Sequence, residues 1–130
     1  MIGPEPVAAV ARAWQDLVDE LDGDEAAVDR FATIWLELLP RRLTSCRRAL
    51  ARGDRESARV RLLTLRSSAV MLGLDDFART AWRCQAALDE VRGDDDVTSA
   101  RSLARDLVDE AQTAAALVRA ALGQARWSKR

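Results

Sequence analysis

The sequence contains no histidine, so no imidazole in these 130 residues can act as general base, metal ligand or phosphoryl carrier. It has only two cysteines, Cys46 and Cys84, which is too few for a zinc site. Both cysteines fall on apolar helical stripes. We therefore predict buried, reduced thiols in a cytoplasmic protein rather than a disulfide.

Long hydrophobic runs and an excess of one charge are also missing. The longest uncharged runs, Ser67–Leu74 and Ala111–Val118, have eight residues each, whereas a membrane span needs about 20. The first residues lack the basic flank and apolar run of a signal peptide. The 20 basic and 21 acidic side chains nearly cancel, so no bulk charge attracts nucleic acid or anionic lipid. We expect neither nucleic acid nor a membrane as partner.

Strong helix formers dominate what is present. Ala, Leu, Arg, Glu and Lys account for 68 of the 130 residues, and the chain has only six glycines and three prolines. Hydrophobic residues make up 48%, enough for one core in a chain of this length. The composition therefore predicts an all-α protein folded as a single domain over residues 1–130.

Apolar residues recur with helical spacing in five segments. The predicted helices cover about 5–21, 25–52, 55–72, 76–92 and 97–125, with turns at Gly23, Gly53, Gly73 and Gly93. Because the apolar phase continues across Pro40, we expect one kinked helix there. The short turns predict an antiparallel four-helix bundle over about 24–125, with an additional N-terminal helix.

The predicted core is made of the apolar stripe of each helix. Its members are Val7, Val10, Ala11, Trp14, Leu17, Val18, Leu21, Val28, Phe31, Trp35, Leu38, Leu39, Leu43, Cys46, Leu50, Ala58, Leu62, Leu65, Ala69, Leu72, Phe77, Ala81, Cys84, Leu88, Val91, Leu103, Leu107, Ala111, Ala114, Val118 and Ala121. Trp127 to Arg130 are expected to form a frayed tail.

The third predicted helix has a second apolar feature away from its core stripe. Leu63 and Val70 lie about 130° from the centre of that stripe at 100° per residue, with Ser67 between them. Arg59 and Arg66 flank this strip, and it is extended by Val60 and Met71. Either another helix, such as the first, covers the strip, or it is a docking surface for a partner protein.

Residues 62–73 of the same helix read Leu-Leu-Thr-Leu-Arg-Ser-Ser-Ala-Val-Met-Leu-Gly. This segment resembles the signature of histidine-containing phosphotransfer (HPt) domains, Ala-His-x-Leu-Lys-Gly-x-x-x-x-Leu-Gly. The preceding helix and turn are similar to the family in Phe31, Leu36, Pro40, Leu43, Ala51, Gly53 and Asp54. Gln85 stands where the family often has a polar residue beside the phosphoryl site. The resemblance implies the HPt four-helix bundle.

The departures from the family pattern decide the chemistry. The phosphorylated histidine aligns with Leu63, the following lysine with Arg66, and the glycine beside the imidazole with Ser67. A leucine has no nucleophilic atom, so this position cannot carry a phosphoryl group. The resemblance therefore implies a degenerate member of the family, a pseudo-HPt domain, and not an enzyme.

The resemblance also implies a role for the strip, because HPt domains dock receiver domains of response regulators on this face. The expected function is a signalling module that binds a receiver domain or a histidine kinase without carrying phosphate. The residues expected to contact the partner are Arg59, Leu63, Arg66, Ser67, Val70 and Gln85. The alternative is a structural bundle that self-associates, as a homodimer, through Val60, Leu63, Val70 and Met71.

Other chemistry has little support in the sequence. The glycines are dispersed, so there is no phosphate-binding loop, and the serines have no imidazole base. The acidic clusters at 75–76 and 94–96 begin helices, where the helix dipole accounts for them. The basic stretch of Arg41, Arg42, Arg47 and Arg48 has acids nearby, which disfavours nucleic-acid binding. We expect no metal and no cofactor.

Overall fold

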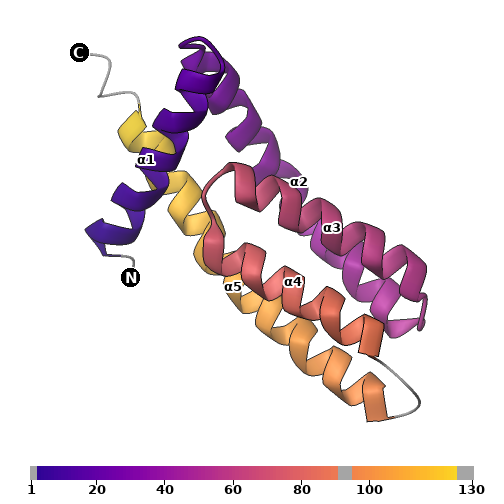
Figure 1. Ribbon diagram of the computed structural model, residues 1–130. Coiled ribbons are helices and arrows are strands. Elements are labelled where there is room, and N and C mark those ends of the chain that lie inside the picture. The colour runs from indigo at the N-terminus through magenta and orange to yellow at the C-terminus, as the bar shows by residue number, and fades with distance from the viewer. Residues whose placement is uncertain (1–2, 91–94, 126–130) are drawn as a thin grey trace.

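The computed structural model describes residues 3–90 and 95–125, and every element in those ranges is a helix (Figure 1). The elements are α1 (Pro4–Glu20), α2 (Glu25–Ala51), α3 (Arg55–Met71), α4 (Asp75–Glu90) and α5 (Asp95–Ala125). The prediction of an all-α fold is confirmed. The predicted helix end at 92, the turn at Gly93, the core position Val91 and the tail from Trp127 lie outside the described residues.

The helix boundaries follow from local capping chemistry. The side chains of Asp24 and Asp54 accept hydrogen bonds from the backbone N–H groups of Ala27 and Ser57, at 3.0 and 3.2 Å, which caps α2 and α3. Gly53 ends α2 with a φ of 71°, in the left-handed region that glycine adopts without strain. Helix α5 begins two residues earlier than predicted, so Asp95 and Asp96 belong to it rather than to a turn.

Helix α2 runs through Pro40 without interruption, which confirms one helix rather than two. Pro40 lies on an exposed side of α2. A proline lacks the N–H that would bond to the carbonyl four residues earlier. On an exposed side water can satisfy that carbonyl, so the helix continues.

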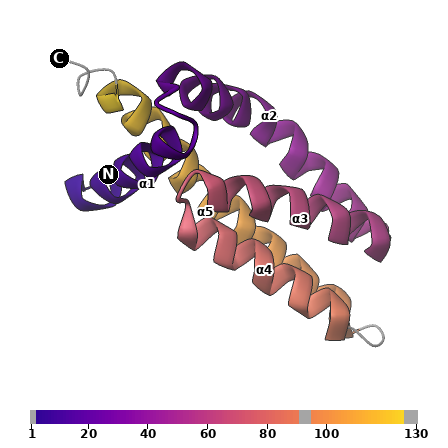
Figure 2. The same ribbon diagram turned by 45° about the horizontal axis from the view of Figure 1, so that its top comes forward.

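Helices α2 to α5 form a closed four-helix bundle. Each packs against its neighbours in the order α2, α3, α4, α5 and back to α2, so the α3–α4 edge lies opposite the α2–α5 edge. Helix α1 stands apart from this ring and crosses one end of the bundle, where it contacts α5 and α2 (Figures 1 and 2). This is the additional N-terminal helix that the sequence predicted.

The core occupies the axis of the bundle and contains most of the predicted stripe residues. Trp35 and Phe77 form its aromatic centre, with ring centroids 6.0 Å apart in an edge-to-face arrangement. Leu21 is a correction: it was expected inward but is 44% exposed, because α1 ends at Glu20 and the chain turns there. Seven other predicted core residues are only partly buried: Ala11, Leu17, Phe31, Leu38, Leu43, Leu50 and Leu103.

Candidate functional site: the exposed α3–α4 face

Large apolar side chains gather on the solvent side of α3 and α4. Val60, Leu63, Val70 and Met71 of α3 are 58%, 49%, 57% and 50% exposed, and Trp82 of α4 is 50% exposed. We call these five residues the apolar face. The opposite side of α3, with Leu62 and Leu65, is fully buried. Leu63 and Val70 thus lie away from the core, as the helical spacing predicted, and of the two alternatives left open by the sequence the described residues show the uncovered strip.

Helix α1 leaves this face open because it is held at the end of the bundle. The indole Nε1–H of Trp14 donates a 2.9 Å hydrogen bond to the carbonyl of Leu72, just past the end of α3. A Cβ on Gly73 would lie 2.4 Å from the Cβ of Ala13, so the two backbones approach closely. These contacts place α1 beside the α3–α4 turn rather than over Leu63.

The packing of α3 on α4 determines which side chains are level with one another. Arg59 donates to and forms an ion pair with Asp89 of α4, which marks the antiparallel register of the two helices. Moving one turn along each helix from this pair brings Leu63 level with Gln85. The structure therefore brings together the two positions that the sequence singled out on different helices.

A further turn brings Arg66 and Val70 beside Trp82. These three residues line a shallow hollow of about 310 Å³ together with Asp75, Ala78 and Arg79. Trp82 was not among the residues predicted from the sequence. One signal could have found it, because Trp82 falls between the core positions Ala81 and Cys84 and is thus directed out of the bundle.

The polar residues predicted for the site have different environments. Arg59 is held by Asp89, whereas Arg66 is half-buried and pairs with no carboxylate in residues 3–90 and 95–125. Ser67 is exposed. Gln85 is half-buried, and its Oε1 atom has no hydrogen-bond partner in the described part of the chain. Arg66 is therefore the cation of this face that is available to an acidic partner.

The only thiols in the sequence lie in the core and not at this face. Cys46 and Cys84 are free and buried, as predicted. Burial raises the pKa of Cys46 to about 11 and that of Cys84 to about 12. Both thiols are thus protonated at neutral pH and are not nucleophiles.

Neither a metal-binding cluster nor a membrane-spanning helix is found among the residues that the structure describes. No group of three or more acidic or cysteine side chains in these ranges could hold a metal ion. None of the described helices is both long and apolar enough to cross a membrane.

Helices α2 to α5 thus form an antiparallel four-helix bundle that exposes an apolar, arginine-edged helical face. A sequence model of the Hpt domain family matches residues 30–126, about three quarters of the chain. The chain belongs to the Hpt domain family and is a signalling module related to phosphorelays. The match begins within α2, so α1 lies outside it. The comparisons with curated proteins and with solved structures give no match.

Proposed function

We propose that this chain binds the receiver domain of a response regulator, or a histidine kinase, through the apolar face and carries no phosphate. Hpt domains act with response regulators and kinases in phosphorelays, so membership of the family supplies the class of partner. The observation that carries the proposal is the exposed Leu63, which stands at the histidine position of the family pattern in a chain without histidine.

The apolar face has the properties of a docking surface. Its five large side chains are each about half exposed, and such a cluster favours a partner that removes it from water. Trp82 is of the residue type most often found at the centre of protein interfaces. Arg66 borders the hollow beside it, where it would face the acidic pocket of a receiver domain.

The chemistry of the chain supports binding without phosphoryl transfer. Hpt domains carry a phosphoryl group on a histidine nitrogen, and none of the 130 residues is histidine. The chain would then occupy the receiver surface that an active Hpt domain needs. It would act as a competitor or a tuner of a phosphorelay, not as a carrier, and its reduced thiols suit a cytoplasmic site of action.

The test is direct binding to the purified receiver domains and kinases of the same organism, each with and without beryllofluoride to mimic phosphorylation. We expect at least one to bind, and Leu63→Asp to weaken binding by about tenfold or more, since it places a charge in the interface. Ile34→Asp is the matched control, because Ile34 is also 50% exposed but lies on α2. If nothing binds, or if both variants have equal effects, the proposal is wrong.

Self-association through the same face is the second candidate, supported by the exposed α3 strip of Val60, Leu63, Val70 and Met71. Molecular mass in solution separates the two functions. A homodimer that Leu63→Asp converts to a monomer would favour self-association. If the wild type is a monomer and the Leu63→Asp variant has the same mass, the result would favour an external partner.

A further inference from the structure

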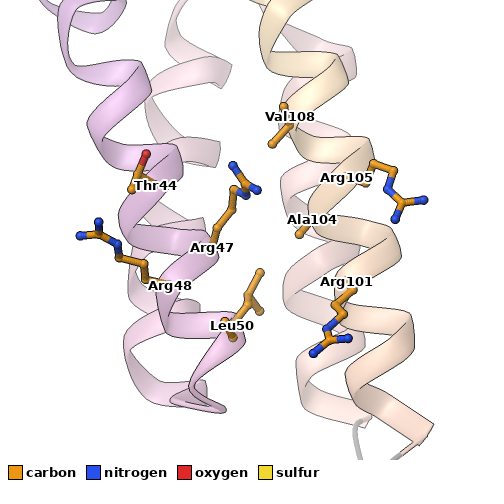
Figure 3. A pocket seen from close by; sticks show the side chains of 9 residues that line it. Thr44, Arg47, Arg48, Leu50, Arg101, Ala104, Arg105 and Val108 are labelled. Carbon is orange, nitrogen blue, oxygen red and sulfur yellow. The ribbon is translucent and has the colours of Figure 1, made fainter.

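A second surface lies on the opposite edge of the bundle from the apolar face. A cleft of about 600 Å³ separates the C-terminal half of α2 from the N-terminal half of α5 (Figure 3). Four arginines line it, Arg47 and Arg48 from α2 and Arg101 and Arg105 from α5. We call it the arginine cleft. The exposed surface within it is mostly apolar, because Leu50, Ala104 and Val108 lie between the arginines.

The cleft follows from the spacing of residues on two antiparallel helices. Helix α2 contributes positions 44, 47, 48 and 51, with Leu50 beside them, and α5 contributes positions 101, 104, 105 and 108. The four numbered positions on each helix have the i, i+3, i+4, i+7 spacing of one helical face, about 10 Å long. Ala51 and Ala104 are too small to fill the space between the two helices. The result is an open groove two turns in length.

The positive charge of the cleft is not neutralised within the described residues. Arg52, Arg59, Arg79 and Arg83 each pair with an aspartate elsewhere on the surface. In contrast, no arginine of the cleft forms an ion pair in the part of the chain that the structure describes, and no acidic side chain of that part lines the cleft. The whole chain has a net charge of −1, so this concentration of positive charge is local. The four guanidinium groups repel one another, and this positive charge favours an anionic partner.

The arrangement of the guanidinium groups indicates the shape of that partner. Arg47 and Arg101 extend into the space between the helices, whereas Arg48 and Arg105 point outward on opposite sides (Figure 3). A compact anion such as phosphate is bound by donors that converge on one point. Here the charges are spread along both rims of an apolar floor. A ligand with acidic groups on both sides of an apolar ridge fits this pattern.

We propose that the arginine cleft binds an acidic amphipathic helix of a partner protein. Apolar side chains of that helix would pack on Leu50, Ala104 and Val108, and flanking Asp and Glu residues would pair with the arginines of both rims. The apolar floor supplies affinity, and the two charged rims select the acidic partner and its orientation. Because this edge is opposite the α3–α4 edge, both surfaces can be occupied at once.

The test uses a fluorescent synthetic peptide, a helix with a leucine ridge flanked by glutamates on both sides, and measures its binding by anisotropy. A peptide of the same composition in scrambled order is the ligand control. We expect the ordered peptide to bind at least about tenfold more tightly than the scrambled one, and to lose affinity as salt is raised. Arg47→Glu with Arg101→Glu should weaken binding by about tenfold or more.

Arg30→Glu with Arg119→Glu is the matched control for this variant. It makes the same change in net charge, on exposed residues of the same two helices outside the cleft, and should leave binding within about twofold. Arg48→Glu with Arg105→Glu provides a second disruption if the first variant loses its helical circular dichroism. Failure of the ordered peptide to bind, equal binding of the scrambled peptide, or equal effects of cleft and control variants would overturn the proposal. So would tighter binding of tripolyphosphate or duplex DNA than of the peptide.

Discussion

Trp14 of α1 donates its indole N–H to the carbonyl oxygen of Leu72, 58 residues away in the sequence, in a buried hydrogen bond of 2.9 Å. This bond joins a helix outside the family match to the end of the helix that carries Leu63. Carbonyls at the end of a helix lack partners inside the helix. Trp14 satisfies one of them, so α1 stabilises the α3–α4 turn.

Trp14→Phe should therefore destabilise the protein by about 1–3 kcal/mol, because it removes the donor and leaves a buried carbonyl unsatisfied. The measurement is the free energy of unfolding from urea titration. Trp82→Phe is the control, since Trp82 is half exposed and its change should stay within about 0.5 kcal/mol. Equal losses in the two variants would mean that the Trp14 bond contributes nothing to stability.

Alanine substitutions at Gly73 and Gly53 separate the effect of the contact with α1 from the effect of backbone strain. Both have a φ of 71°, so an alanine at either position costs about 1–2 kcal/mol in strain. A Cβ at Gly53 meets nothing within 4 Å, whereas one at Gly73 lies 2.4 Å from the Cβ of Ala13. We expect Gly73→Ala to cost at least about 1 kcal/mol more than Gly53→Ala. Identical unfolding free energies would show that α1 is free to move away.

Stability should fall in alkaline solution because of the two buried thiols. Burial raises the pKa of Cys46 to about 11 and that of Cys84 to about 12, while the pKa of cysteine in the unfolded chain is about 8.5. Above the unfolded pKa the unfolded chain loses protons that the folded chain keeps, so the free energy of unfolding decreases with pH up to the folded pKa values. Below the unfolded pKa the thiols make no contribution to this dependence.

The measurement compares the pH dependence of unfolding in the wild type with that of a Cys46→Ala, Cys84→Ala variant. Each thiol contributes a slope of at most about 1.4 kcal/mol per pH unit. The variant should lose this slope between about pH 9 and 11, whatever its stability at neutral pH. Parallel curves for the two proteins would show that the thiols are accessible in the folded state.

Restoring the family's residues tests whether the α3–α4 face keeps the geometry of an Hpt site. Leu63→His supplies a nucleophile, and Ser67→Gly leaves space beside it. Gln85 lies at the same level on α4, and Arg66 is one turn away on α3. Because Leu63 is half exposed, the cost is mainly that of a glycine inside a helix, about 1 kcal/mol.

We expect the double variant to accept a phosphoryl group from a phosphorylated receiver domain that binds the wild type, measured as acid-labile label on this chain. The wild type, which lacks histidine, is the control and should accept none. A folded variant that binds the receiver and stays unlabelled would show that the docking geometry has diverged from that of phosphate-carrying relatives.

The five helices, the all-α class and the outward direction of Leu63 and Val70 could be predicted from the sequence alone. Each depends on helical periodicity and capping within one segment, and these act over a few residues. The lack of histidine likewise excludes phosphoryl transfer through imidazole whatever the fold. Leu21 was predicted wrongly because its periodicity continues one residue past the point where α1 ends.

Only the tertiary structure decided which faces meet. It placed α1 across the end of the bundle, through Trp14 and Gly73, and so left Leu63 open to solvent. It brought Trp82 beside Arg66, and it brought arginines of α2 and α5, more than 50 residues apart in sequence, to one cleft. The physical reason is that periodicity reports the faces of a single helix, whereas the pairing of faces depends on how distant segments pack together.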